Sequence, residues 1–246
     1  MRLINKKLLI IVATHGDEKI GIEVVEKLKA KKLGCFFDSL VANPRALEKG
    51  IRFTEADLNR SYPGMKNSKF YEKRRACEIF KLARKYKYVV DIHEAITGIN
   101  NFIIAPREKL YKIFPIGLLD IKAVLLWPDP KGPLGQFLKN VVELEFGMRN
   151  KKRKTVIGEA TKIMGKFIIN IYAVESAESF SAKEFYYVYG KLKREDYKGK
   201  ISSLKDFREA SINKETFFSL LVGGYYLKQG IVCYKMRKLE IDSNSM

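Results

Sequence analysis

Hydrophobic residues gather in short continuous runs along the chain, and amphipathic segments separate several of these runs. The first run covers residues 8–14, and in residues 18–32 the side chains of Ile22, Val25 and Leu28 recur at helical spacing. A continuous apolar run is typical of a strand buried on both faces, whereas the spacing that follows is typical of a helix packed against it. The pattern therefore predicts a strand followed by a helix.

The same alternation continues to about residue 171. It predicts further helices over residues 68–86 and 155–171, and further strands over residues 35–42, 88–92, 102–105, 123–127 and 141–146. Strands that are apolar throughout and separated by helices form a mostly parallel sheet with helices on both faces. The expected fold class is α/β, with a doubly wound, mostly parallel (mixed) sheet.

The character of the sequence changes after about residue 175. Segments 185–192 and 217–239 are rich in Tyr, Phe, Val and Ile, and glycines interrupt the second of them. Such segments are typical of short β-strands joined by turns. We therefore expect two domains, an α/β catalytic domain over residues 1–175 and a small β-rich domain over residues 176–246.

The chain of 246 residues contains 47 Lys and Arg against 28 Asp and Glu, a formal net charge of +19. This charge attracts anionic partners, but it favours neither small acids nor nucleic acids, because the cations are spread along the chain. No apolar run reaches the roughly 20 residues of a membrane span, and the first residues show no signal-peptide pattern. We expect a cytoplasmic protein without a membrane partner. The sequence leaves homo-oligomer formation open.

Only two histidines occur in the chain, and both lie at the ends of apolar runs. His15 and Glu18 are three residues apart across a strand-to-helix turn, whereas His93 ends a strand more distant in the sequence. Ligands of open α/β sheets bind beyond the carboxyl ends of the strands, where these side chains should lie. Two imidazoles and a carboxylate, with a fourth position for water, are typical of a catalytic zinc site. One His-x-x-Glu string is common by chance, so the prediction depends on all three residues.

Water activated by zinc needs a base that takes up its proton. Glu143 and Glu145 share one face of an apolar strand, and Glu145 is nearer to the carboxyl end. A carboxylate in so apolar a strand must be paired, solvated or functional, and Glu145 is the candidate base. Asp91, two residues before His93, is either a carboxylate that orients a ligand histidine or the buried partner of a basic residue. The sequence leaves both interpretations open.

A long irregular segment after residue 43 carries groups that could bind a substrate. A tetrahedral intermediate needs a positive group at its oxyanion, and a planar guanidinium is suited to holding a carboxylate. Arg45, Asn59 and Arg60 supply these chemistries in this segment. A long loop of this kind is often functional.

Five motifs follow one another along the chain: Thr14-His15-Gly16-Asp17-Glu18, Asn43-Pro44-Arg45-Ala46, Asp57-Leu58-Asn59-Arg60, Asp91-Ile92-His93 and Leu144-Glu145-Phe146-Gly147. In this order they resemble the motifs of the succinylglutamate desuccinylase and aspartoacylase family, relatives of the zinc carboxypeptidases. The segment 217–226 is also similar to the β-domain segment that carries an active-site tyrosine in that family. The resemblance implies a sheet of zinc-carboxypeptidase type and covers most of the chain.

The resemblance also implies a reaction, the hydrolysis of the amide between an acyl group and an amino acid. It implies that His15, Glu18 and His93 bind one zinc ion per chain. Glu145 would be the general base that activates the water and later protonates the amine. The implied partner is a small anionic N-acyl amino acid.

The resemblance assigns specific roles to four further residues. Arg45 would polarise the scissile carbonyl, and Asn59 and Arg60 would hold a carboxylate of the substrate. Of the two adjacent tyrosines near the C-terminus, Tyr225 is the one expected to reach the site.

The sequence departs from the family pattern at three places. Glu94 follows His93, where the family has a small or amide residue, and it adds a negative charge beside the expected metal. Residues 148–150 replace a phrase rich in proline and glutamine. Residues 132–135 contain no counterpart of the arginine that aspartoacylase places before its catalytic glutamate. The specificity for the acyl group therefore does not carry over.

Other functions are compatible with parts of this pattern. The same groups would serve a carboxypeptidase-like hydrolase that cuts a peptide or a cell-wall fragment. A family member could also bind metal without turnover. A basic nucleic-acid-binding protein without catalysis is a less favoured alternative, and it predicts binding that weakens steeply with salt.

Overall fold

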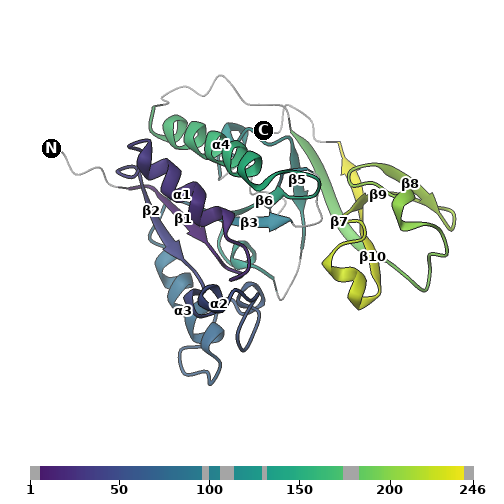
Figure 1. The fold of residues 1–246 in the computed structure, drawn as a ribbon, viewed down its shortest axis with the longest axis horizontal. Helices are drawn as coiled ribbons and strands as arrows, with labels where there is room; N and C mark the ends of the chain where they lie inside the picture. Colours follow the sequence, from purple (N-terminus) through teal and green to yellow (C-terminus); the bar gives the residue numbers. More distant parts are fainter. Residues whose placement is uncertain (1–5, 96–99, 106–113, 129–131, 174–182, 241–246) are drawn as a thin grey trace.

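The structure, a computed structural model, describes residues 6–95, 100–105, 114–128, 132–173 and 183–240. Within these residues one ten-stranded mixed sheet runs through the molecule in the order β2-β1-β3-β6-β4-β5-β7-β10-β9-β8 (Figure 1). Its strands are β1 (Leu8–Val12), β2 (Phe37–Val41), β3 (Tyr88–Ala95), β4 (Phe102–Ala105), β5 (Ala123–Leu126), β6 (Val141–Gly147), β7 (Glu184–Lys193), β8 (Glu209–Ile212), β9 (Glu215–Leu220) and β10 (Ile231–Leu239).

In the described ranges, four α-helices and several short 3-10 helices connect these strands. The α-helices are α1 (Ile20–Ala30), α2 (Pro44–Lys49), α3 (Tyr71–Ala83) and α4 (Arg153–Ala173). The 3-10 helices are η1 (Leu58–Arg60), η3 (Ile116–Leu118), η4 (Leu134–Gln136), η5 (Ile201–Ser203) and η6 (Tyr225–Gln229). Among the described residues, no helix is long and apolar enough to cross a membrane.

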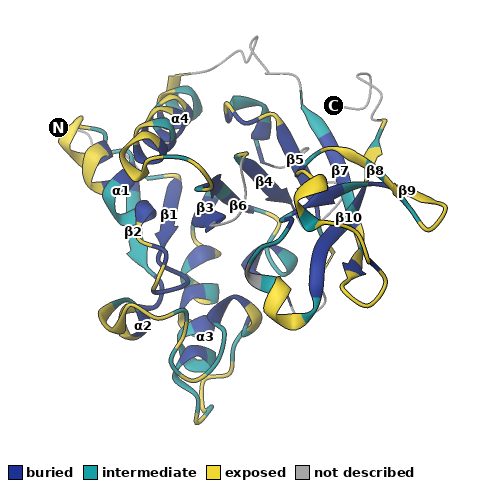
Figure 2. Ribbon diagram, turned by 45° about the vertical axis from the view of Figure 1, so that its right-hand side comes forward, coloured by how far each residue is buried: buried dark blue, intermediate teal, exposed yellow. Residues whose placement is uncertain are grey.

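Helices cover both faces of the N-terminal part of the sheet. Leu8, Ile10 and Val12 of β1 pack in one core together with residues of α1 and α4. Leu9 and Ile11 of the same strand face the opposite core, which contains residues of α3. Because successive side chains of a strand point to opposite faces, a strand buried on both faces is apolar at every position. This is the layering seen in Figure 1, and Figure 2 shows the buried central strands. The predicted α/β fold with its mixed sheet is confirmed.

The direction of the strands changes four times along the sheet, once between β6 and β4 and three times among β7, β10, β9 and β8. β2, β1, β3 and β6 are parallel to one another, and β4 runs antiparallel to β6. β5 and β7 are parallel to β4 and to each other, and β10, β9 and β8 follow as an antiparallel extension. The C-terminal β-rich segment therefore continues the central sheet through β7. The predicted domain boundary near residue 175 lies outside the described residues, and the division into two domains stays a prediction.

Candidate metal and active site

Three adjacent parallel strands bring the predicted site residues together. β1 lies next to β3, and β3 lies next to β6, so that their carboxyl ends meet at one edge of the sheet. In the register of β3 and β6, Asp91 is opposite Glu143, and His93 is opposite Glu145. His15 follows β1 at the same edge. Sequence positions that are far apart therefore contribute to one cluster because the strands that carry them are neighbours.

The turn between β1 and α1 depends on two unusual backbone positions. Ala13 has a φ of 53°, in the left-handed region that side chains other than glycine rarely adopt. Its carbonyl accepts a hydrogen bond from the Asn43 backbone N–H at 3.0 Å, which ties the turn to the start of α2. A Cβ atom on Gly16 would lie 2.1 Å from the carbonyl carbon of Ala46. Only a glycine lets the two backbones approach this closely, and this contact fixes the position of His15.

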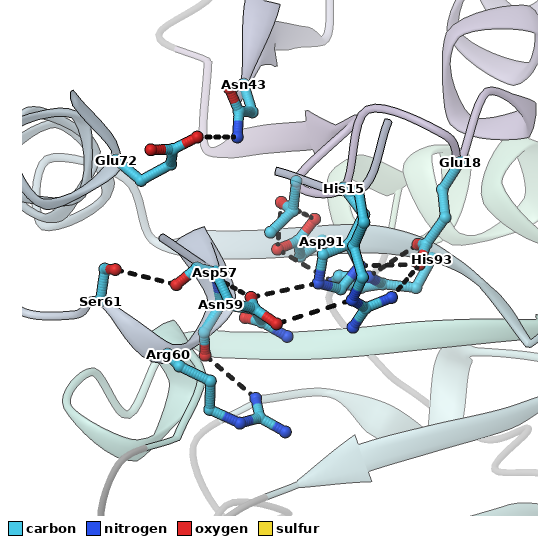
Figure 3. A network of polar contacts seen from close by, with 12 residues as sticks. His15, Glu18, Asn43, Asp57, Asn59, Arg60, Ser61, Glu72, Asp91 and His93 are labelled. Carbon is cyan, nitrogen blue, oxygen red and sulfur yellow. Dashed lines mark hydrogen bonds and ion pairs between the residues drawn. The ribbon is translucent and has the colours of Figure 1, made fainter. Parts of the chain in front are cut away.

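The Glu18 carboxylate lies between the two imidazole rings (Figure 3). Its Oε1 atom is 2.7 Å from Nδ1 of His15, and its Oε2 atom is 3.0 Å from Nδ1 of His93. All three side chains are buried, with exposed fractions of 3%, 5% and 1% for His15, Glu18 and His93. The predicted His15, Glu18 and His93 are therefore brought together, and the Nδ1 atoms face the carboxylate.

The outer edges of both rings face further carboxylates. Nε2 of His93 lies 3.2 Å from Oδ2 of Asp91, and Nε2 of His15 lies 3.4 Å from Oδ1 of Asp57. The Thr14 hydroxyl is 3.0 and 2.9 Å from the two carboxylate oxygens of Asp91 and donates its hydrogen bond there. Of the two interpretations of Asp91, the geometry favours the one in which it orients a histidine, because its carboxylate contacts a ring edge directed away from the cluster.

Charges within the cluster stabilise one another. Although burial alone would raise the pKa of Glu18, the charges and hydrogen bonds of His15 and His93 hold it well below its ordinary value. Burial lowers the pKa of His93, but the carboxylates of Asp91 and Glu18 outweigh it and raise this pKa well above 6.5. The cluster thus holds protons on its imidazoles. A cation that bound the same nitrogens would displace those protons.

Two more carboxylates lie on β6 beside the histidines. Glu143 is buried, accepts a hydrogen bond from Nδ2 of Asn59 at 3.3 Å, and lies 3.8 Å from Nε2 of His93. Glu145 is partly exposed and lines a cavity, and no described residue donates a hydrogen bond to its carboxylate. Burial raises the pKa of each of these glutamates to about 7. Glu145 therefore has the access and the proton affinity that a general base needs near neutral pH.

The loop from Gly50 to Arg60 is held by a buried carboxylate of α3. Glu72 accepts hydrogen bonds from the backbone N–H groups of Thr54, Glu55 and Ala56 at 2.7, 3.2 and 3.2 Å. The Thr54 hydroxyl at 2.6 Å and the Asn43 side-chain amide at 3.3 Å complete its partners. Five donors on one fully buried carboxylate give the loop a fixed path. That path carries the next functional residues into the site.

Arg52 and Asp57 enter the site from this loop. Nη1 of Arg52 lies 3.4 Å from Oε1 of Glu18, and its Nε atom lies 3.6 Å from Oδ2 of Asp57. Burial would raise the pKa of Asp57, but His15, Arg52 and Arg60 lower it to about 2. Neither Arg52 nor Asp57 has a role that the sequence predicted. An arginine five positions before an Asp-Leu-Asn-Arg motif has no periodic signal that would identify it.

The structure places Arg45 elsewhere. It belongs to the first turn of α2, it is exposed, and its guanidinium carbon lies 4.2 Å from the centre of the Tyr71 ring. It is not among the residues that line the cavity described next. The role expected for Arg45 is thus available to Arg52, whose guanidinium lies beside the cluster.

A cavity of about 120 Å³ opens at this edge of the sheet, and we call it the inner cavity. The predicted residues that line it are His15, Glu18, Asn59, Arg60 and Glu145, and Arg52, Trp127, Glu143 and Tyr226 join them. His93 lies behind this lining, in contact with Glu18. The side chain of Tyr225 is outside the described part of the structure, whereas its neighbour Tyr226 lines the cavity. The sequence motifs therefore did not identify Tyr226 as the C-terminal aromatic residue that lines the cavity.

Glu94, the unexpected acid after His93, has partners of its own. Its Oε1 atom accepts a hydrogen bond from the Ile20 backbone N–H at 2.6 Å, at the first turn of α1. Nη1 of Arg153 lies 3.4 Å from its carboxylate. A carboxylate at a helix N-terminus is stabilised by the unpaired N–H groups and the helix dipole. The extra charge beside the cluster is thus offset by α1 and Arg153.

The donor set of the cluster fits a zinc ion. One ligand atom each from His15, Glu18 and His93 lies within 4.8 Å of the others, and all three side chains are buried. Two nitrogens and one carboxylate oxygen leave a coordination position open in a tetrahedral shell, as catalytic zinc sites do. The Asp57 and Asp91 carboxylates lie 3.4 and 3.2 Å from the Nε2 atoms of His15 and His93, on the ring edge where metal-ligating histidines commonly have an acceptor.

Comparison with known proteins gives matches along most of the chain. Residues 4–114 match the family model described as the succinylglutamate desuccinylase/aspartoacylase catalytic domain. A probable aspartoacylase from Prochlorococcus marinus (strain MIT 9215) is 30% identical over 131 residues, 48% of this chain and 44% of the relative. A succinylglutamate desuccinylase from Pseudomonas fluorescens is 30% identical over 152 residues, 50% of this chain and 43% of the relative. The matched segments thus span less than half the length of these curated relatives.

The fold gives a wider match than the sequence. The crystal structure of the succinylglutamate desuccinylase from Chromobacterium violaceum superposes with a TM-score of 0.74 at 21% sequence identity. The superposition covers 97% of this chain and 86% of that one, so the C-terminal strands are included. Residues 4–114 therefore match the catalytic domain of that family, and the superposition shows that the chain shares the fold of a succinylglutamate desuccinylase over nearly its whole length.

Proposed function

We propose that this protein is a zinc-dependent hydrolase that cleaves the amide bond of a small N-acyl amino acid. The observation that carries the proposal is the convergence of His15 Nδ1, His93 Nδ1 and the Glu18 carboxylate beside Glu145 on the adjacent strand. The names of the relatives, aspartoacylase and succinylglutamate desuccinylase, support an acylated amino acid as the substrate.

His15, Glu18 and His93 would hold the zinc ion. When bound, zinc acts as a Lewis acid that makes water a nucleophile near neutral pH. Asp57 and Asp91 would hold the two rings in the orientation that presents Nδ1 to the ion, because each carboxylate faces an Nε2 atom. A fixed tautomer follows from this arrangement, with the proton on Nε2 and the lone pair on Nδ1.

Glu145 would move the proton. Its carboxylate takes a proton from the water whose oxygen attacks the amide carbonyl carbon. When the carbon–nitrogen bond breaks, Glu145 returns that proton to the departing nitrogen, which leaves as an amine, and the acyl group leaves as a carboxylate. A pKa raised to about 7 by burial suits both steps, since the group then exchanges its proton readily near neutral pH.

Arg52, Asn59 and Arg60 would bind the substrate. Arg52 lies beside Glu18 and can donate to the carbonyl oxygen as it gains negative charge. Arg60 and the side-chain amide of Asn59 line the same cavity and can hold a carboxylate. The Tyr226 hydroxyl, also in the lining, is the aromatic donor that we assign in place of Tyr225.

The test combines metal content with amide hydrolysis. We expect one zinc per chain, loss of activity on chelation, and recovery on adding zinc back. Across a panel of N-acetyl, N-succinyl and longer N-acyl amino acids, Glu145→Gln should lower kcat by at least about 100-fold, the contribution typical of a general base. Glu209→Gln, which removes an exposed carboxylate on β8, is the matched control.

Two results would contradict the proposal. If the purified protein held no stoichiometric metal and gained no thermal stability on adding zinc, the proposed metal site would be wrong. Full activity of Glu145→Gln with zinc present would leave the metal site in place but reassign the base, and Glu143→Gln would then be the next variant.

A further inference from the structure

A second cavity of about 650 Å³ adjoins the inner cavity on the side of the C-terminal strands. The two cavities share four lining residues, which form the passage between them: Arg52, Arg60, Trp127 and Tyr226. A molecule bound at the zinc ligands could therefore extend through this passage without any change in the fold. We call the second cavity the aromatic groove.

Six of the residues that line this groove are aromatic, and the others include the cations Arg52, Arg60 and Lys191. Tyr187 and Tyr189 come from β7, and Tyr234 comes from β10. The Tyr234 ring makes edge contacts with Trp127 at 4.6 Å and with Tyr226 at 5.2 Å between ring centres. Tyr189, in contrast, is 41% exposed, although a large aromatic ring gains most from burial. The groove thus presents ring surface that the protein itself leaves uncovered.

Cations accompany these rings. Nζ of Lys191 lies 5.6 Å from the centre of the Tyr234 ring, and Arg52 and Arg60 stand at the passage. The groove therefore suits a ligand that combines a planar ring with a nearby negative charge, since the ring can contact aromatic edges while the charge meets a guanidinium.

The sizes of the two cavities decide how a substrate would be divided between them. Pockets for small molecules commonly measure about 300–1,000 Å³. The inner cavity, at about 120 Å³, is well below this range, whereas the groove, at about 650 Å³, lies inside it. The inner cavity is small for a whole N-acyl amino acid, and the groove is the adjoining space that can take the remainder of the substrate.

We propose that the aromatic groove binds the side chain of the amino-acid half of the substrate, and that the protein prefers N-acyl amino acids with an aromatic side chain. This rests on the function proposed above, in which Arg60 holds the substrate carboxylate. Because Arg60 lines both cavities, a carboxylate held there places its own α-carbon at the passage. The side chain on that carbon is then the substituent nearest to the groove, and the acyl group lies on the far side of the amide.

Binding can be measured without turnover, because Trp127 is the single tryptophan of the chain and stands at the passage. We would titrate the protein with 3-phenylpropanoate and with butanoate, two carboxylates that contain no amide, and follow Trp127 fluorescence. We expect 3-phenylpropanoate to bind at least about tenfold more tightly, the gain expected when one ring is buried against aromatic walls. Equal affinities would overturn the proposal.

Two variants at one position separate the ring from the rest of Tyr189. Tyr189→Leu removes the aromatic face, and we expect it to weaken binding of 3-phenylpropanoate about five- to tenfold. Tyr189→Phe keeps the ring and loses only the hydroxyl, which donates to Glu215 at 2.8 Å, so it should bind like the parent. Since Tyr189 is exposed, neither variant should unfold the protein. Equal affinities of Tyr189→Leu and the parent would contradict the aromatic assignment.

Kinetics then distinguish this proposal from the proposed function. We expect kcat/KM for N-acetylphenylalanine to exceed that for N-acetylalanine, with a ratio that falls in Tyr189→Leu and not in Tyr189→Phe. Equal values for the two substrates would reject the groove and leave the amidohydrolase intact. Selective binding of 3-phenylpropanoate without hydrolysis of any amide would support the groove and reject the amidohydrolase. Preference for N-benzoylalanine over N-acetylphenylalanine would show that the groove takes the acyl half, against our assignment.

Discussion

Oδ2 of Asp91 lies 3.2 Å from Nε2 of His93, on the ring edge opposite the one that faces Glu18. Asp91 therefore acts on the metal through the orientation and basicity of His93. Replacement by Asn keeps the shape but removes the charge, and we expect Asp91→Asn to weaken zinc binding about 10–100-fold. Competition with a chelator of known affinity measures this constant.

The control for this prediction is Asp120→Asn, which removes an exposed carboxylate that pairs with Lys166. It should leave the zinc affinity as it is in the parent. If Asp91→Asn bound zinc as tightly as the parent, the contact with His93 would have only a packing role.

Arg52 and Arg45 are the two candidates for the residue that polarises the substrate carbonyl. Arg52 contacts Glu18 in the inner cavity, whereas Arg45 stacks on Tyr71 outside its lining. We expect Arg52→Ala to lower kcat about 100–1,000-fold, the loss typical of removing an oxyanion donor. Arg45→Ala should lower it less than about threefold, a change of under 1 kcal/mol. The reverse order in steady-state kinetics would restore the assignment made from the motifs.

Glu72 gives a test of how the loop is held. A glutamine at this position presents an amide N–H₂ to groups that are themselves donors, such as the N–H of Glu55 and of Ala56. We expect Glu72→Gln to lower the free energy of unfolding by about 2–3 kcal/mol, measured by urea denaturation. Hydrogen exchange at the amides of Thr54 to Ala56 should also become faster.

Glu78→Gln on the same helix is the comparison, since Glu78 is exposed and pairs with Arg75 at the surface. It should change stability by less than about 0.5 kcal/mol. Similar losses in the two variants would show that the helix is sensitive to any loss of charge.

Gly16 tests the close approach of the first turn to α2. An added Cβ would overlap the Ala46 backbone, so we expect Gly16→Ala to cost about 1–3 kcal/mol of stability and to weaken zinc binding by moving His15. Gly158 in α4 is the matched site, because a Cβ there meets nothing within 4 Å. Gly158→Ala should stabilise the protein by about 0.5–1 kcal/mol. Thermal unfolding of both variants, with and without zinc, provides the measurement.

The lowered pKa of Lys183 leads us to expect that the stability of the protein depends on pH. Burial lowers the pKa of its ammonium from 10.5 to about 8. Between these two values the unfolded chain holds more protons than the folded one, so the free energy of unfolding gains a contribution as the pH rises from 8 to 10.5. Because the side chain is partly exposed, we expect this contribution to be about 1–2 kcal/mol. It is lost again as the pH falls through 8.

Comparison with Lys183→Met isolates this contribution from other groups that titrate in the same range. The difference in unfolding free energy between parent and variant should change in favour of the parent as the pH rises. A constant difference from pH 7 to pH 11 would mean that the ammonium titrates normally.

The sequence predicted the strand ends well, because they depend on a local signal. An apolar run that stops at a polar residue identifies the end of a buried strand, and neighbouring parallel strands put their ends at one edge. This reasoning placed His15, His93 and Glu145 in one region, and the structure has them there. Glu18 could be placed in the same region because it is close in sequence to His15.

The loop residues could not be predicted in the same way. Arg52 reaches the cavity because Glu72, on a helix that begins later in the chain, holds the backbone just after it. Arg45 lies in the first turn of a helix, where the direction of a side chain depends on which face packs. The spacing of hydrophobic residues in the sequence does not determine where the side chain of either arginine points. The same holds for Trp127 and Tyr226, which come together with Tyr234 only through the order of the C-terminal strands.

The pairing of β5 with β7 has a mechanical consequence. Residues 123–126 of β5 align with residues 184–187 of β7, and so the walls of the inner cavity and of the aromatic groove belong to one hydrogen-bonded sheet. Two lobes joined in this way cannot swing apart about a hinge without breaking the ladder between them. Substrate would therefore enter a preformed channel, and a change of preference would have to arise by exchanging side chains along its walls.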